Sequence, residues 1–277
     1  MAKIAIDAGH GKYTAGKRCL KSLDKNETRE WILNSRIATD LEMYLKSAGH
    51  ETLRVDDITG ETDVSLSNRV KKANDWKADY YISIHHNAGV KGGSGGGTVV
   101  YKYNGATGKS KSTQEAIYEY VIKRGNLKGN RYDGTLDGNF YVIRKTSMPS
   151  SLIECGFMDS STDIKYILDK EWSKKIALGI AEGICKVYGG IIVQTTTNTG
   201  VNKDKENTFV PYKVKIVANT LNIRKGAGTN YDKNGVVKKD NVYTIIDEAT
   251  GKGATKWGKL KSGSGWISLD LSYVKKV

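Results

Sequence analysis

The 277-residue sequence predicts an α/β domain, with a mostly parallel twisted sheet flanked by helices, followed by a small all-β domain. Strand-like and helix-like segments alternate over residues 1–188, as in a sheet that helices cover. Residues 189–211 are rich in Thr, Asn, Lys and Gly and lack periodicity, as a linker does. Residues 212–277 contain short strand-like runs separated by glycine-bearing turns, which predicts a small barrel or sandwich.

Hydrophobic periodicity and turn signals define the expected elements. Apolar residues recur at helical spacing over residues 26–48, where Asn26 is expected to cap the helix and Gly49 to end it. Ser65 or Ser67 lies near the expected cap of the next helix. In chain order, the first domain is expected to contain strand 3–8, helix 26–48, strand 50–55, helix 65–76, a strand within 78–89, strand 97–103, a helix near 110–124, strands 141–145 and 151–157, and a helix over 171–188; strands 212–217, 242–249, 256–261 and 265–269 are expected in the second.

The positive charge is concentrated toward the C-terminal end. The net charge is +14; residues 1–188 contain 29 Lys and Arg against 23 Asp and Glu, whereas residues 189–277 contain 15 against 7. Such an excess indicates attraction to a polyanionic surface, either nucleic acid or an anionic cell wall.

Composition also restricts the class of protein. No segment approaches the roughly 20 apolar residues of a membrane span, so we expect no membrane insertion. Asp7 and His10 interrupt any signal-peptide pattern, so we expect synthesis in the cytoplasm without a signal peptide. Cys19, Cys155 and Cys185 are scattered and form no CxxC pair, which favours reduced, buried thiols over disulfides or a cysteine zinc site.

Histidines and acids occur where the predicted strands end. Three positions lie at or just past the C-terminal ends of strands: His10, the pair His85 and His86, and Glu154. A further acid, for which Glu27 and Glu30 are the alternatives, lies near the start of the first helix. Because parallel strands open their carboxyl ends onto one crevice, these side chains are expected to meet. Two imidazoles and one carboxylate form a ligand set for catalytic zinc. A second carboxylate, off the metal, can move the proton of an attacking water.

The surroundings of each candidate indicate either a functional or a structural role. Glycines flank His10 and let the backbone approach an ion closely. His85 and His86 point to opposite faces of their strand, so only one of them needs to face the crevice. His50 follows Gly49 at a helix C-terminus, where a cation is favoured, which indicates a structural role. Glu154 is an acid inside an apolar strand, and this indicates function.

The first domain resembles the zinc-dependent N-acetylmuramoyl-L-alanine amidases of the amidase-3 type, the catalytic domains of many bacterial autolysins and phage endolysins. The sequence "DAGHG" matches the family's first zinc histidine, here His10. The family's ligand glutamate lies four residues before an N-x-x-I-A pattern, which begins here at Asn34 and selects Glu30 over Glu27.

Two further motifs carry the same resemblance. "SIHHNA" (83–88) matches Ser-Ile-His-x-Asn-Ala and selects His85 over His86, although the family more often has a small residue where His86 stands. "MPSSLIECGFMDSSTD" (148–163) resembles the stretch that bears the catalytic glutamate, here Glu154.

The resemblance implies a Zn²⁺ cofactor and cleavage of the amide between the lactyl group of N-acetylmuramic acid and the L-alanine of the stem peptide. It implies His10, Glu30 and His85 as metal ligands and Glu154 as general base and then acid. Asn87 and the segment 131–139, beginning at Arg131, are expected to line the substrate groove.

The second domain is similar to the bacterial SH3b module, which predicts a small all-β SH3-like barrel over residues 212–277. "ANTLNIRKGAGTNYD" followed by "KWGKL" and "GWISLDLSYV" carries this likeness. Such modules bind cell-wall peptidoglycan, and Tyr231, Trp257, Trp266 and Tyr273 are candidates to stack on sugars or to grip a peptide. The alternative is that Trp257 and Trp266 fill a small core.

Two short motifs are chance matches. "GGSGG" (92–96) fits the esterase pattern G-x-S-x-G, but no histidine follows His86, so we expect a flexible loop beside the crevice. "GATGKS" resembles a phosphate loop, but Tyr103 stands where that motif needs glycine.

The sequence thus predicts a two-domain peptidoglycan amidase whose partner is the bacterial cell wall and not nucleic acid. A phage endolysin that reaches the wall through a holin pore is the first hypothesis. The alternatives are a bacterial autolysin of the same chemistry, a zinc peptidase cutting within the stem peptide, and a wall- or nucleic-acid-binding protein without activity.

Overall fold

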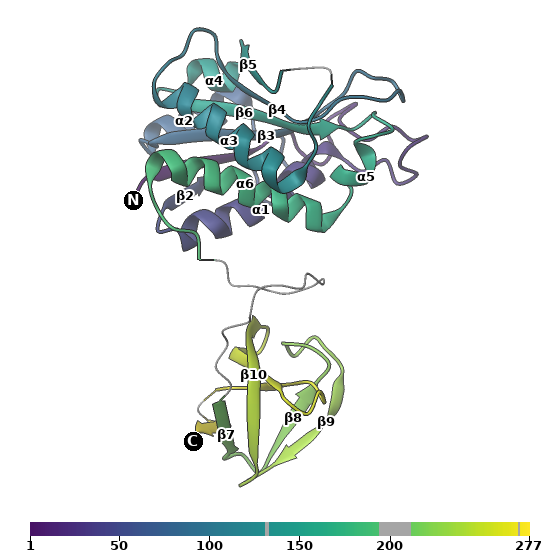
Figure 1. The fold of residues 1–277 in the computed structure, drawn as a ribbon, viewed down its shortest axis with the longest axis vertical. Coiled ribbons are helices and arrows are strands. Elements are labelled where there is room, and N and C mark those ends of the chain that lie inside the picture. The colour runs from purple at the N-terminus through teal and green to yellow at the C-terminus, as the bar shows by residue number, and fades with distance from the viewer. Residues whose placement is uncertain (131–132, 194–211, 271) are drawn as a thin grey trace. The chain divides into compact units, whose positions relative to one another are not determined.

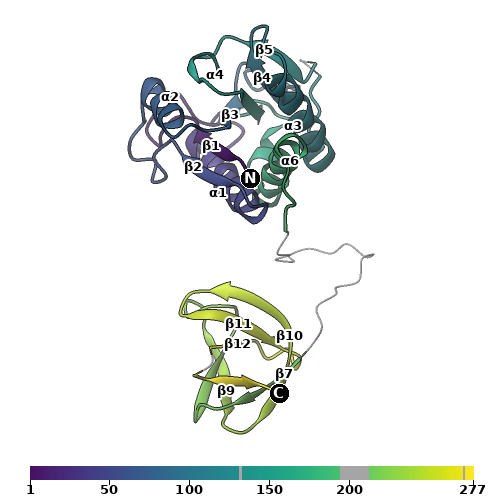
Figure 2. The same ribbon diagram turned by 90° about the vertical axis from the view of Figure 1, so that its left-hand side faces the viewer.

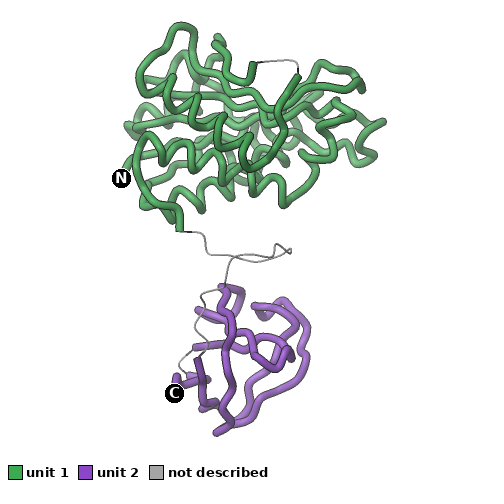
Figure 3. The backbone as a smooth tube through the Cα atoms, viewed as in Figure 1, with its two compact units in different colours: residues 1–194 green, residues 195–277 purple. Residues whose placement is uncertain are grey.

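The computed structural model describes residues 1–130, 133–193, 212–270 and 272–277 (Figure 1). The chain divides into two compact units, residues 1–194 and 195–277 (Figure 3). Most of the predicted linker, residues 189–211, lies outside the described residues. Within the described ranges, no helix is both long enough and apolar enough to cross a membrane.

The first unit is a six-stranded sheet covered by helices. The strand order is β2-β1-β3-β6-β4-β5, and all neighbours are parallel except β4, which runs antiparallel to β6. The predicted α/β class is confirmed, with a mixed sheet. The strands are β1 Lys3–Ala8, β2 Glu51–Arg54, β3 Tyr80–Asn87, β4 Val99–Tyr103, β5 Thr135–Gly138 and β6 Ser150–Phe157; the helices are α1 Glu30–Ser47, α2 Leu66–Asp75, α3 Lys109–Gly125, α4 Tyr141–Lys145, α5 Ile164–Ile167 and α6 Lys170–Tyr188.

Strand alternation divides the core between the two faces of the sheet. Ile4 and Ile6 of β1 pack with α1, α3 and α6, whereas Ala5, between them, packs toward α2 and α4 (Figure 2). Successive strand residues point to opposite faces, so each helix layer receives every second side chain. Both faces of β1 and β3 are therefore apolar until the strands reach their carboxyl ends.

Two sequence expectations for this unit are wrong. Residues 141–145 form helix α4 and not a strand; Val142 and Ile143 are both buried, and a short apolar run does not distinguish the two conformations. Helix α1 begins at Glu30 and not at Asn26, because Glu27 has a left-handed φ of 47°. Asn26 does not cap the helix; its N–H is bonded in a turn to the Asp24 carboxylate. The cap at Ser65 is confirmed.

The second unit is a seven-stranded antiparallel sheet in the order β13-β7-β10-β11-β12-β8-β9. Each of the four expected runs contains a strand, and β8, β9 and β13 complete the sheet. The strands are β7 Tyr212–Ile216, β8 Thr220–Arg224, β9 Lys233–Lys238, β10 Val242–Gly251, β11 Ala254–Leu260, β12 Trp266–Ser268 and β13 Val274–Lys276. The unit is β-rich as expected; an SH3-like barrel stays a prediction.

Candidate metal centre

The candidate site lies at the carboxyl ends of three adjacent parallel strands, β1, β3 and β6. The β1–β3 register pairs Ala8 with Ile84, and the Gly9 N–H continues the ladder by donating to the Ile84 carbonyl at 3.0 Å. On the next strand, His85 pairs with Glu154. The carboxyl ends of β1, β3 and β6, which are distant in sequence, therefore lie at the same edge of the sheet, as the parallel arrangement requires.

His10, Glu30 and His85 converge at this edge. His85 Nδ1 lies 3.1 Å from Glu30 Oε1, and His10 Nε2 lies 3.3 Å from Glu30 Oε2. One ligand atom from each of the three residues lies within 4.8 Å of the others. Glu30, the first residue of α1, is buried. Glu27, the competing acid, instead lies 3.3 Å from the Arg18 guanidinium.

The glycine before His10 makes room for the other imidazole. A Cβ on Gly9 would lie 2.1 Å from Cε1 of His85, so a side chain at this position would displace the ring. His10 itself has a left-handed φ of 67°, a conformation that costs a non-glycine residue about 1–2 kcal/mol. The two rings meet edge to face, with centroids 5.0 Å apart.

His86 points away from this group, into the protein. Its Nδ1 lies 2.8 Å from the Asn34 amide oxygen, while the Asn34 amide nitrogen donates to the Gly9 carbonyl at 3.1 Å. Burial lowers the pKa of His86 to about 3, so its imidazole is neutral at physiological pH. His86 thus supports the backbone at Gly9 and is not a member of the His/Glu group.

Glu154 is a carboxylate without a fixed partner beside the group. Its Oε2 is buried and accepts no hydrogen bond from any described residue. Burial raises the pKa of Glu154 to about 7; the charge of Glu30 adds to this rise, and His85 and Lys17 oppose it. A carboxyl with this pKa can take up and release a proton near neutral pH.

Two hollows of about 300 Å³ each flank the histidines. The first is lined by Ala15, Gly16, Lys17, Glu30, His85, His86, Asn87, Ala88, Glu154 and Met158. The second is lined by Asp7, Gly9, His10, Asp63, Val64, Ser65, Leu66, Arg69 and His85. Asn87, expected in the substrate groove, lines the first hollow, and its contact with substrate stays a prediction. Sequence reasoning missed Lys17, whose Nζ is 3.9 Å from Glu30 Oε2 and which lies in an irregular loop without a motif.

The remaining candidates lie elsewhere or outside the described residues. Arg131 is not described. Tyr231 and Trp266 belong to the second unit: Tyr231 is 47% exposed, and Trp266 is half-buried with Lys259 Nζ 5.9 Å from its ring centre. Trp257 is buried, in agreement with a core role. His50 is structural as expected: its Nδ1 accepts from the Ala2 N–H, and its Nε2 lies 2.9 Å from the Gly189 carbonyl oxygen.

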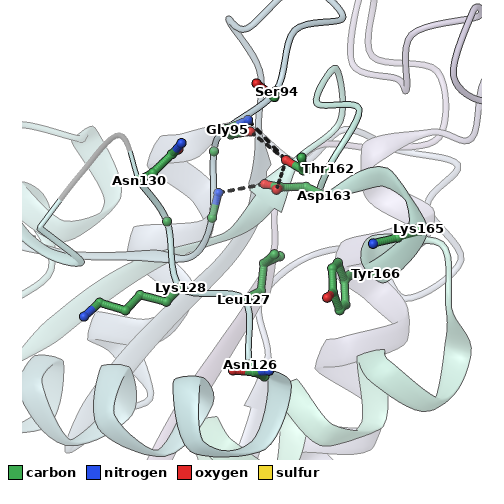
Figure 4. A pocket seen from close by; sticks show the side chains of 13 residues that line it. Ser94, Gly95, Asn126, Leu127, Lys128, Asn130, Thr162, Asp163, Lys165 and Tyr166 are labelled. Atoms are coloured by element: carbon green, nitrogen blue, oxygen red, sulfur yellow. Dashed lines mark hydrogen bonds between the residues drawn. The ribbon is translucent and has the colours of Figure 1, made fainter.

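A larger hollow of about 400 Å³ lies beside the glycine loop and contains none of the four chemical candidates (Figure 4). The loop that contains "GGSGG" is not free, in contrast to the sequence expectation. Gly95 N donates to the Thr162 hydroxyl at 3.2 Å, and Gly97 N donates to the buried Asp163 carboxylate at 2.7 Å. The turn after β6 therefore holds this loop in place.

Comparison with known proteins finds similarity to a family of amidases. The family described as N-acetylmuramoyl-L-alanine amidase matches residues 4–186. The N-acetylmuramoyl-L-alanine amidase CwlM of Bacillus licheniformis is 31% identical over 188 residues, 68% of this chain and 69% of that protein. The endolysin of Bacillus phage SPP1 is 28% identical over 283 residues, 99% of this chain and 98% of its own length. The catalytic domain of the amidase CwlV from Bacillus (Paenibacillus) polymyxa var. colistinus has a TM-score of 0.61 at 29% identity, covering 69% of this chain and 100% of that one.

Proposed function

This chain belongs to the N-acetylmuramoyl-L-alanine amidase family, and we propose that it is a zinc-dependent peptidoglycan hydrolase. It would cleave the amide between the lactyl group of N-acetylmuramic acid and the L-alanine of the stem peptide. The observation that carries this proposal is the convergence of His10, Glu30 and His85 at one strand edge, with the unpartnered carboxylate of Glu154 beside them.

The three converging residues fit a zinc ion by their chemistry. Two imidazoles and one carboxylate leave a position open for substrate or water. Burial alone would raise the pKa of Glu30, but the adjacent imidazoles outweigh it and hold the pKa well below its usual range, so the carboxylate is ionised. When bound, zinc supplies a Lewis acid that polarises the scissile carbonyl and increases the acidity of water.

Glu154 then moves the proton that hydrolysis requires. As a carboxylate it accepts a proton from the attacking water, and as a carboxylic acid it donates that proton to the leaving nitrogen of L-alanine. Its pKa near 7 makes both protonation states accessible in one cycle. Asn87 and Lys17 line the same hollow and can bind polar groups of the muramyl peptide.

Product analysis on purified peptidoglycan tests the reaction. An amidase releases new alanine N-termini and leaves free lactyl carboxylates, whereas a peptidase acting within the stem leaves muramyl-alanine joined. We expect new alanine N-termini from the wild type and none after chelation or from Glu154→Gln. Muramyl-alanine that stays joined would contradict the amidase proposal and favour the peptidase.

We further propose that residues 212–277 form an SH3b-type module that binds the wall. The excess of basic residues in this part of the chain and the half-exposed rings of Tyr231 and Trp266 support it. In the full chain inactivated by Glu154→Gln, Tyr231→Ala and Trp266→Ala are expected to reduce co-sedimentation with isolated walls several-fold. Unchanged co-sedimentation would assign these rings to packing.

The biological setting that we propose is that of a phage endolysin. The similarity to the phage SPP1 endolysin extends over nearly the whole of both chains, which supports it over an autolysin of the same chemistry. Such an enzyme is made in the host cytoplasm without a signal peptide and reaches the wall through a holin. Expression in a susceptible bacterium should therefore cause lysis only when a holin is co-expressed; lysis without one would favour an exported autolysin.

A further inference from the structure

A buried ion pair lies directly behind the two histidines and has no part in the chemistry described so far. Asp7 on β1 and Arg69 on α2 are each 1% exposed, and the guanidinium donates to the carboxylate through Nη1. Desolvation offsets much of the Coulomb attraction in such a pair, so a buried ion pair is weak evidence for stabilisation. Its contacts indicate another role.

Asp7 reaches His85 through Ser83. The Asp7 carboxylate accepts hydrogen bonds from the Tyr81 and Ser83 hydroxyls, each at 2.7 Å. Because Ser83 donates its proton to Asp7, its oxygen can only accept from His85 Nε2, which lies 3.2 Å away. His85 therefore carries a proton on Nε2 and turns Nδ1 toward Glu30 Oε1. Either a second proton or a metal ion between Nδ1 and Oε1 satisfies both atoms, so Nδ1 is the nitrogen that His85 presents to a metal.

Arg69 reaches His10 through the backbone. Its Nη2 donates to the His10 carbonyl at 3.0 Å, its Nη1 donates to the Ala8 carbonyl at 2.7 Å, and its Nε donates to the Val64 carbonyl at 2.7 Å. These bonds join the turn after β1 to the start of α2. They hold His10 in the left-handed conformation that directs its ring toward Glu30.

We propose that Asp7, Ser83 and Arg69 are positioning residues for the metal centre, with Ser83 fixing which nitrogen His85 presents and Arg69 fixing the backbone of His10. This inference rests on the proposed zinc function. Groups that orient a histidine ligand through its second ring nitrogen typically change metal affinity by about 10- to 100-fold when removed.

Ser83→Ala tests the contact that links Asp7 to His85, and Ser151→Ala is its matched control. Both serines are fully buried in central strands, but Ser151 pairs with Ile82, which faces the α1 side of the sheet, away from Asp7. The zinc dissociation constant of the full chain is measured by competition with a chromophoric chelator. We expect about a 10- to 100-fold rise for Ser83→Ala and no more than about a twofold rise for Ser151→Ala. Equal constants for the two variants would overturn the inference.

A second measurement needs no substitution at Asp7, Ser83 or Arg69. In zinc-loaded, ¹⁵N-labelled wild-type chain, the ring resonances of His85, assigned by their loss in His85→Gln, report the protonated nitrogen. We expect a proton on Nε2 and metal coordination through Nδ1; the opposite pattern overturns the role of Ser83 even if Ser83→Ala does not fold. A wild type that binds no zinc would instead overturn the proposed function. Tight wild-type binding with an unchanged Ser83→Ala constant would overturn the positioning role alone.

Discussion

Glu30 and Glu154 are carboxylates of one hollow whose pKa values shift in opposite directions. Burial raises the pKa of both, but the imidazoles of His10 and His85 outweigh it at Glu30, whereas Glu154 reaches about 7. Environments that separate the pKa values of two acids assign them different tasks. Glu30 stays ionised and can hold a cation, while Glu154 can exchange a proton.

Glu154→Gln should change how the stability of the metal-free chain depends on pH. The pKa of Glu154 is about 7 in the folded chain against an ordinary value of 4.5, so the folded chain keeps a proton that the unfolded chain releases. The contribution of this proton to the free energy of unfolding is complete below pH 4.5 and is lost as the pH rises through 7. The free energy of unfolding then decreases by about 3 kcal/mol at most. Urea unfolding in chelator at pH 5 and 8 should show the wild type losing about this much more stability than the variant, because the other titrating groups, His86 included, are common to both chains; equal changes in the two chains would contradict it.

Gly9→Ala should weaken zinc binding without unfolding the domain. The added Cβ would lie 2.1 Å from the His85 ring, just past the end of β1 and outside the apolar core clusters. The imidazole must move, so the zinc dissociation constant should rise at least about 10-fold. Thermal unfolding in chelator is the control for folding. An unchanged dissociation constant would show that His85 is not held at this position.

At the scale of elements, alternation along β3 assigns each residue near the site its task. Tyr81 and Ser83 point to the α2 side, where their hydroxyls donate to Asp7 of β1, and His85 follows two residues later and contacts Ser83 and Glu30. His86 points to the α1 side, where it meets Asn34. The period of two predicts that the adjacent imidazoles diverge; in the structure His85 joins the His/Glu group, whereas His86 lines the same hollow but is bonded to Asn34. The contacts with Asp7 were not visible, because they depend on the β1–β3 register.

Long periodic elements were predictable and short ones were not. The helix predicted over residues 171–188 has many turns of consistent apolar spacing. Its predicted start differs by one residue from that of α6 in the structure. Strand β5 has four residues and lies at the edge of the sheet, so no apolar alternation marks it. Segment 141–145 carries apolar residues that either conformation can bury, and only the packing of α4 on the sheet selects the helix.

Gly183→Ala should separate α3 from α6. A Cβ on Gly183 would lie 2.5 Å from Cα of Ile117, a backbone atom that cannot move aside. In an open helix position, Gly→Ala would stabilise by up to about 1 kcal/mol; here we expect a loss of about 1–3 kcal/mol, the usual effect of overpacking. Urea unfolding measures the sign, and a stabilised variant would show that the helices are less closely packed. Zinc affinity should not change.

At the scale of the whole molecule, the change in composition along the chain predicted two separate units, whereas the placement of single candidate binding residues did not follow from composition. The convergence of His10, His85 and Glu154 was predictable because the carboxyl ends of parallel strands must meet, whereas the choice of Glu30 over Glu27 and of His85 over His86 came from the family resemblance. Lys17 lies in an irregular loop, and its approach to Glu30 depends on how that loop folds back on the sheet. The rings of Tyr231 and Trp266 could be assigned to the second unit from the sequence, but their exposure depends on strand pairing that the motif does not specify.

The charge asymmetry between the units leads to a test of wall attraction. Residues 189–277 carry 15 basic against 7 acidic residues, and Lys233, Lys239 and Lys252 are exposed there. Changing all three to Gln in the Glu154→Gln chain should reduce co-sedimentation with anionic walls several-fold at low salt. The difference should shrink as salt rises toward 1 M, where the screening length falls to about 3 Å.

The matched control removes the same charge from the first unit, with Lys21, Lys25 and Lys145, also exposed, changed to Gln. If wall binding depends on the second unit, this control should co-sediment like its parent. If both triple variants lose binding equally, net charge alone attracts the chain to the wall, and the second unit has no special part in it. Chelation should leave co-sedimentation of all three chains unchanged, because the candidate metal ligands belong to the first unit alone.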